Sequence, residues 1–273
     1  MRWILLALAI SPLNVLAAGA TLEIVSDQQR LTLSQSQLLS RRDLRTISVA
    51  DSDYKARLTR FKAIPIANLF RGVVIPDAAV VQFRATDGFA ASLEKTRLFS
   101  TDPKAAKAFL AIEDPRSPWP RLPGKTVSAG PFYLVWTNPR ASAVSTEEWP
   151  YQIASFTILT DPRSVFPRIY PAADAAPALQ NGFRSFQRNC FPCHKMNGDG
   201  AGAIGPDLNL PMNPVEYLNA SALKSLIRDP TSVRTWPQRA MVGFPESAIS
   251  DSELADLMAY LAHMSSRKSR ASP

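Results

Sequence analysis

The hydrophobic pattern divides the chain into two parts. Between about Thr21 and Asp161, short apolar or alternating runs have the length of strands, and three helical segments lie among them. The strand candidates are residues 21–25, 30–34, 45–50, 79–85, 132–137 and 153–159, and the helical candidates are 34–41, 65–72 and 102–112. This mixture predicts an α+β domain over residues 21–161.

The pattern changes after residue 161. Prolines crowd residues 162–177, and because proline disfavours regular structure we expect an extended Pro/Ala-rich linker. Helical segments and glycine-rich loops follow, so residues 178–265 are predicted to form an all-α domain. The last helix has the clearest signals, since Ser250 and Glu253 make a capping box. An apolar stripe follows at helical spacing, formed by Leu254, Leu257, Met258 and Leu261.

The first twenty residues have the anatomy of a secretory signal peptide. Arg2 precedes a short apolar core, and small residues follow at 17–20. The apolar core is too short to span a bilayer comfortably, which takes about 20 residues. We therefore expect residues 1–20 to be removed on export to the periplasm, although an uncleaved anchor is the alternative. No later stretch is long enough to cross a membrane.

The composition indicates a folded, basic protein. Of 273 residues, 46% are hydrophobic, which favours a packed core, and the formal net charge is +8. A positive charge favours acidic partners or surfaces. The basic residues are scattered outside the tail at 266–273, so we expect no nucleic acid to be bound.

Both cysteines lie in one motif, Cys190-Phe191-Pro192-Cys193-His194. A disulfide across two residues would close a very small ring and would be redox-active rather than structural. The spacing is typical of covalent haem c attachment, in which each thiol binds one vinyl group and the following histidine ligates the iron. Two alternatives remain. A zinc site would need four ligands, for which His263 is the remaining candidate, and a redox dithiol normally lies at a helix N-terminus.

The iron's other axial position has several candidates. Met241 and Met212 lie in predicted loops, whereas Met258 and Met264 lie on the last helix, where a core role is expected. Met196 is too close to His194 to reach the opposite face. We predict Met241 as the ligand, with Met212, His263 or an open position as alternatives.

The region from about Gly182 to Met264 resembles class I cytochrome c domains. Gly182, Phe186 and Cys190 follow that family's pattern, and Tyr260 matches the aromatic residue of its last helix. The resemblance implies that Gly205-Pro206 supplies a carbonyl to His194 and that Met241 is the axial methionine. It also suggests that Trp236 and Arg239 lie near the haem propionates.

The N-terminal region gives weaker signals. It holds no cysteine or histidine, which excludes imidazole ligation and a Cys/His nucleophile. The order of its TDGF turn and GPFYLVW strand is similar to the molybdopterin-binding domain of the sulfite oxidase superfamily. That family's cysteine ligand to molybdenum is missing, so a non-catalytic docking or structural role is implied. The acidic pairs 113–114 and 147–148 and Asp87 are expected in solvated turns. The aromatic–proline motifs are expected in the domain's own core, with a surface that binds a partner as the alternative.

Together these observations predict an exported single-haem c-type cytochrome. It would transfer electrons to or from a protein redox partner that is acidic at its docking surface. The first alternative is the haem subunit of an oxidoreductase whose N-terminal domain helps form a substrate site. The second is a haem-based sensor or peroxidase, which requires an open axial position.

Overall fold

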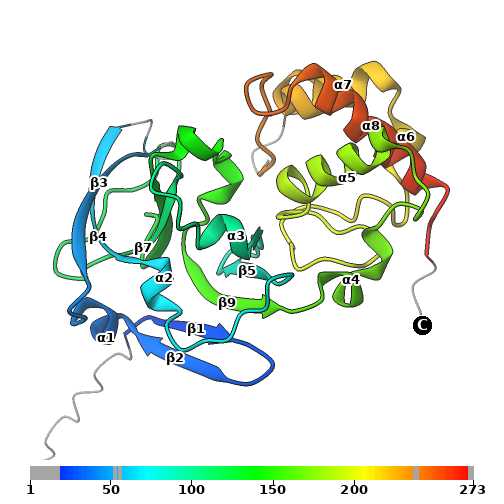
Figure 1. Cartoon of the computed structure of the whole chain (residues 1–273). Helices are drawn as coiled ribbons and strands as arrows, with labels where there is room; N and C mark the ends of the chain where they lie inside the picture. Colours follow the sequence, from blue (N-terminus) through cyan, green and yellow to red (C-terminus); the bar gives the residue numbers. More distant parts are fainter. Residues whose placement is uncertain (1–18, 52–53, 55–56, 236–239, 270–273) are drawn as a thin grey trace, which may run out of the picture.

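A computed structural model describes residues 19–51, 54, 57–235 and 240–269 of the chain. Figure 1 shows a β-rich region formed by the first half of the chain beside a helical region formed by the second. Two separate hydrophobic clusters correspond to them, one within residues 20–158 and one within residues 166–264. The predicted class, an α+β region followed by an all-α region, is confirmed.

The β-rich region contains two sheets. The first has the order β2-β1-β9-β5-β6, and in it only β1 and β9 pair in parallel among the described strands. The second is antiparallel, with the order β3-β4-β7-β8. Strand bounds are β1 Thr21–Val25, β2 Arg30–Ser34, β3 Arg45–Asp51, β4 Arg57–Pro65, β5 Val80–Ala85, β6 Ser92–Glu94, β7 Lys107–Ile112, β8 Phe132–Thr137 and β9 Ile153–Leu159.

Short helices connect these strands. They are α1 Gln35–Leu39, α2 Ile66–Leu69 and α3 Lys95–Leu98, with single 3-10 turns at Pro139–Ser142 and Thr146–Glu148. The first two match the predicted helical segments. Each begins where an alternating strand pattern stops, and α1 has a complete capping box at Ser34.

The predicted helix over 102–112 is wrong. Its apolar half forms β7, which pairs with β4 on one side and β8 on the other. Five of the six β7 residues are buried, as are five of six in β8. A run buried on both faces has no alternation, so its periodicity does not separate strand from helix.

The helical region consists of α5 Pro177–Asn189, α6 Pro214–Tyr217, α7 Ala220–Arg228 and α8 Asp251–Ser265, with a 3-10 turn at Pro230–Ser232. The predicted capping box of α8 is present, since the Ser250 hydroxyl accepts from the Glu253 amide and the Glu253 carboxylate accepts from the Ser250 amide. Among the described residues, no helix is long and apolar enough to cross a membrane.

The segment between the two regions is not an extended linker. It contains α4 Pro162–Val165 and a 3-10 turn at Pro167–Ile169, each with its proline in the first helical turn. Proline is tolerated there because its missing N–H has no helical partner anyway. Ile169 is buried among the side chains of the helical region, and the Ala172 amide donates to His263. The segment therefore packs as part of that region.

Candidate functional site

The cysteine motif lies immediately after α5. The carbonyl of Phe186 accepts from the amides of Cys190 and Phe191, and the carbonyl of Cys190 accepts from those of Cys193 and His194. These bonds fold the motif into a tight turn. Phe191 is buried in the core, while both thiols and the imidazole are half-buried. The motif is thus anchored from one side and accessible from the other.

The anchor is the crossing of α5 and α8. A Cβ at Gly182 would overlap the Asp256 carbonyl group and lie 2.8 Å from the Cβ of Tyr260, so only glycine permits this approach. Phe186 and Tyr260 pack at the same crossing, with ring centroids 5.2 Å apart. The buried hydroxyl of Tyr260 donates to the carbonyl of Ile169 at 2.6 Å. The expected roles of Gly182 and Tyr260 at this crossing are both confirmed.

The loop around residue 205 orients the imidazole of His194. Nδ1 of His194 donates to the Pro206 carbonyl at 2.7 Å, as the family resemblance implied. Gly205 lies so close to the ring that a Cβ there would be 2.5 Å from Nδ1. Burial lowers the pKa of His194, which favours the neutral ring. With Nδ1 occupied, Nε2 is the nitrogen left for a metal.

The two thiols are poorly suited to dithiol redox chemistry. Burial, together with the carboxylate of Glu147, raises the pKa of both Cys190 and Cys193 to about 12. Cys190 caps the C-terminal end of α5 rather than a helix N-terminus. A reactive dithiol requires the opposite conditions, a lowered pKa and exposure.

The zinc alternative also lacks support in the described part of the chain. No group of three or more His, Cys, Asp or Glu side chains there is placed to hold a metal ion. His263 contacts the backbone of residue 172 instead.

The methionines that could ligate the iron differ in how deeply they are buried. Met196 and Met264 are buried in the helical region's core, and Met258 packs against it, which confirms the core role expected of the last two. Met212 is half exposed. Met241 is partly buried and lies three residues before the buried Phe244, whose amide donates to Ile227. Trp236 and Arg239, the predicted propionate neighbours, lie outside the described residues.

A buried asparagine ladder, which was not predicted from the sequence, stabilises the loop beyond the motif. Asn209 donates to the side chain of Asn197 and to the Met264 carbonyl, both at 2.8 Å. Asn213 donates to Asn209 and to the carbonyl of Leu261. The amides thus connect the loop to the end of α8. Asparagines at 209 and 213, four residues apart within an otherwise apolar loop, were the available signal.

Asp87 is exposed in its turn, as expected, but Glu148 and Asp114 are buried rather than solvated, contrary to expectation. Glu148 is 4% exposed and pairs with Arg97, while Asp114 is 8% exposed and pairs with Lys62 and Arg116. Burial of a charge requires such partners. Trp149 is buried in the domain's own core, as expected, and Trp119 packs partly against it.

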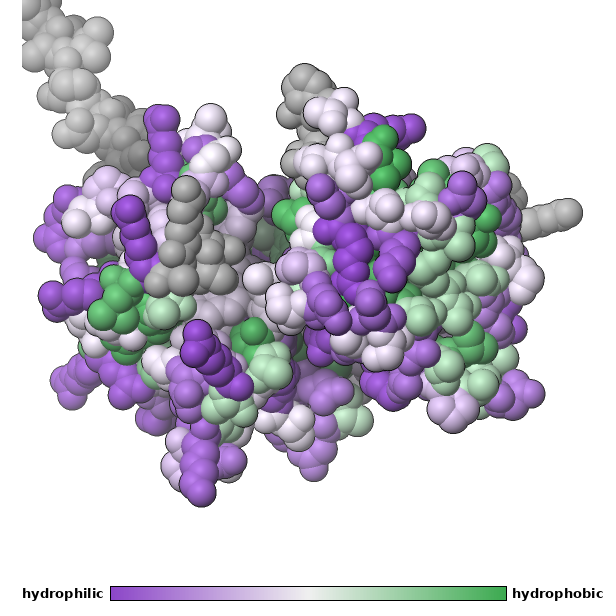
Figure 2. Space-filling view, turned by 90° about the horizontal axis from the view of Figure 1, so that it is seen from above, coloured by the Kyte–Doolittle hydropathy of each residue, from purple (hydrophilic) through white to green (hydrophobic). Residues whose placement is uncertain are grey.

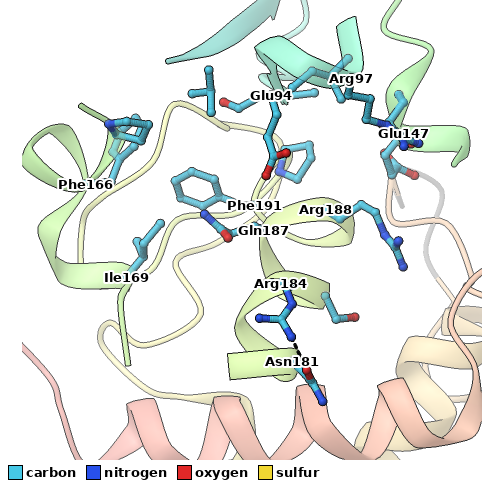
Figure 3. Close-up of a pocket in the computed structure, with 18 of the residues that line it drawn as sticks. Glu94, Arg97, Glu147, Phe166, Ile169, Asn181, Arg184, Gln187, Arg188 and Phe191 are labelled. Carbon is cyan, nitrogen blue, oxygen red and sulfur yellow. Dashed lines mark hydrogen bonds and ion pairs between the residues drawn. The ribbon is translucent and has the colours of Figure 1, made fainter. Parts of the chain in front are cut away.

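The two regions meet beside the motif. The amide of Ala90 donates to the Pro192 carbonyl at 2.9 Å, and that of Ala203 donates to the Gly88 carbonyl at 3.0 Å. Next to this contact lies a cavity of about 580 Å³. Figure 3 shows Glu94 and Arg97 lining it from the N-terminal side, with Arg184 and Arg188 on α5 opposite.

The donor set therefore fits haem c. Two thiols and an imidazole with free Nε2 occur together, which is the set of groups that covalent haem attachment requires, and Gly205 leaves room for the imidazole ring. Comparison with known proteins agrees. Residues 179–265 match the family model described as Cytochrome c. This match supports a c-type cytochrome domain, a covalently bound c-type haem and a haem-based electron-transfer role. It does not extend to residues 21–161, whose resemblance to sulfite oxidase stays a prediction. None of the curated proteins matches the chain.

Proposed function

We propose that this chain is an exported c-type cytochrome with one haem, which exchanges electrons with a periplasmic protein partner. Residues 21–161 act in it as a docking or structural module. The observation that carries the proposal is the hydrogen bond of 2.7 Å that holds His194 beside the two cysteines with Nε2 free. Haem-stained denaturing electrophoresis tests it. The wild-type protein, made with haem-attachment machinery, should carry the stain, and Cys190→Ala/Cys193→Ala should lose it.

In this proposal Cys190 and Cys193 would hold the haem covalently, and His194 and Met241 would ligate its iron. The group supplies a one-electron Fe(III)/Fe(II) couple, which a histidine–methionine pair shifts to higher potential. Pro206 orients His194. Trp236 and Arg239, which lie outside the described residues, would bind the haem propionates.

Met241→Ala tests the axial assignment, with the half-exposed Met212→Ala as the matched control. Loss of the methionine–iron charge-transfer band only in Met241→Ala is expected. A high-spin wild-type spectrum would contradict the assignment and favour the sensor or peroxidase alternative.

Export is proposed from residues 1–20. A signal peptide ending at Ala17, Ala18 or Ala20 predicts a periplasmic mature chain. Mass spectrometry of the periplasmic fraction gives the mature N-terminus directly. A full-length protein that remains in the membrane fraction would support the uncleaved anchor instead.

The charge distribution supports docking through the N-terminal module. Residues 21–161 contain 18 Lys and Arg against 14 Asp and Glu, whereas residues 178–265 contain 7 against 8. The positive excess that would attract an acidic partner is therefore outside the haem-binding region. Arg84 is exposed on β5, next to the contact between the regions.

Electron transfer from an acidic redox protein should slow as salt rises. It should slow further in Arg84→Glu than in the control Arg184→Glu on α5. The reverse order would place docking on the haem-binding region.

The cavity between the regions favours a second candidate, the haem subunit of an oxidoreductase. Its wall includes Phe191 and Pro192 of the cysteine motif, so a molecule bound in the cavity would lie close to the haem that the motif would hold. Both signs of charge line it, since Glu94 and Glu147 lie there together with Arg184 and Arg188. Figure 2 shows hydrophilic residues, in purple, on the surface of both halves of the molecule. The purified chain alone, tested for turnover and for a second cofactor, distinguishes the candidates. Turnover that Arg184→Ala abolishes would support the enzyme.

A further inference from the structure

One turn of the N-terminal sheet makes backbone contact with the cysteine motif. Residues 86–91 connect β5 to β6, and this turn donates one hydrogen bond to the site and accepts another from it. Ala90 donates to the carbonyl of Pro192, which lies between the two cysteines, at 2.9 Å. Gly88 accepts from Ala203, on the loop that follows His194 and leads to Gly205, at 3.0 Å. The turn therefore contacts both segments that form the site.

The packing at this contact leaves no room for side chains. Gly88 has a φ of +94°, and a Cβ there would lie 3.2 Å from the Cβ of Ala203. A Cβ at Gly202 would lie 2.7 Å from the Pro192 carbonyl oxygen, the same atom that accepts from Ala90. The 86–91 turn thus meets two segments that lie about a hundred residues later in the chain, one at Pro192 and one at Gly202-Ala203, at van der Waals distance. Such an approach fixes the position of each segment against the others.

The turn itself is held firmly by the sheet. The Phe83 amide donates to Ala91 at 2.7 Å and the Ala85 amide donates to Phe89 at 2.8 Å. The carboxylate of Asp87 accepts from the amide of Phe89 at 3.0 Å. Ala90 is 2% exposed, so its bond to Pro192 is shielded from water. A turn with this support can transmit the rigidity of the sheet to the motif.

We infer that the 86–91 turn is a positioning element of the haem site, which makes the N-terminal region a structural part of that site rather than a tethered module. The inference rests on the proposed function. The turn holds Pro192 and Ala203 in place and covers that side of the motif. A redox partner therefore cannot contact the motif at Pro192 and meets the N-terminal region there instead.

Charged side chains of the N-terminal region lie near the cysteine motif. Glu147 lines the cavity together with Phe191 and Pro192, and Asp87 precedes Gly88 in the turn. Carboxylates there favour the oxidised state of a redox group held by the cysteines. Loosening the turn should therefore shift the reduction potential.

The test is a matched pair of glycine substitutions in the full haem-loaded chain. Gly88→Ala and Gly72→Ala both replace a glycine with positive φ in the N-terminal region, but only a Cβ at 88 meets another group. Both substitutions strain the backbone in the same way. Any difference between the two variants therefore reports the contact of residue 88 with Ala203. In Gly88→Ala, the amides of Ala90 and Ala203 should exchange hydrogen at least about tenfold faster, equivalent to about 1.4 kcal/mol. The midpoint potential should shift, and Gly72→Ala should show neither change.

A second pair approaches the contact from the other side. Ala203→Pro removes the amide that donates to Gly88, while Ala203→Ser keeps it. Faster exchange at Ala90 and a shifted potential in Ala203→Pro alone would support the inference. Equal exchange and equal potential in Gly88→Ala and Gly72→Ala would overturn it. Failure of haem attachment in the wild-type chain would refute the proposed function, while exchange at Ala90 and Ala203 would still report on the turn.

Discussion

Gly182→Ala is the sharpest test of the helix crossing, because two effects of known size oppose each other. Alanine in a helix is favoured over glycine by about 1 kcal/mol, which by itself would stabilise α5. In this structure a Cβ at 182 would lie 2.6 Å from the Asp256 carbonyl carbon and 2.8 Å from the Cβ of Tyr260. Both neighbours belong to α8 and cannot rotate away. Overpacking costs about 1–3 kcal/mol, and a backbone neighbour favours the upper end.

The net expectation is that Gly182→Ala lowers the free energy of unfolding by about 2 kcal/mol, since overpacking exceeds helix propensity. Urea unfolding measures it, followed by circular dichroism of the helices and by haem absorbance. Gln187→Ala, on the same helix but facing the cavity, is the control and should change stability by no more than about 0.5 kcal/mol. A Gly182→Ala protein as stable as the wild type would refute the close approach of α5 and α8.

Three further substitutions test the supporting structure. Tyr260→Phe leaves the buried carbonyl of Ile169 without its donor and should cost about 1–3 kcal/mol in urea unfolding. Asn209→Ala removes the side-chain amide that connects the Asn197 side chain to the Met264 carbonyl, and it should loosen the loop, visible as faster hydrogen exchange at residues 207–213. Arg228, followed by Lys224, lowers the pKa of Asp251, so this carboxylate stabilises the fold above its unfolded-state pKa of about 3.9 and loses that effect as pH falls through its lower folded-state pKa. Asp251→Asn should therefore be less stable than wild type at pH 7 and converge with it in acid; a constant difference would contradict the ion pair.

The haem-attachment signal is readable in the sequence because covalent chemistry sets its spacing. Two thiols that bind neighbouring vinyl groups and a histidine that follows them must be close along the chain. The capping box of α8 is likewise local, and it is present as predicted. Local signals of this kind can be recognised in the sequence because the residues that make them are neighbours along the chain.

Where the structure of a segment depends on burial against distant residues, the sequence-based predictions were wrong. The residues of β7 have helical composition, and only the strands on either side, β4 and β8, make the run a central strand. Glu148 looks like a solvated acid in sequence, yet Arg97, 51 residues away, pairs with it in the interior. The Pro-rich segment looks extended until its Ile169 is found in the core of the helical region. In each case the deciding partner is distant in sequence.

The sequence by itself determined the chemistry of the site: two thiols and an imidazole at the spacing of haem attachment, and a glycine where two helices cross. Tertiary structure alone decided what surrounds that site. It brought the 86–91 turn, about a hundred residues earlier in the chain, against Pro192, and it placed the charges of Asp87 and Glu147 near Cys193. The physical reason is that spacing along the chain encodes bonded geometry, whereas contact between distant segments follows from how two hydrophobic cores pack side by side.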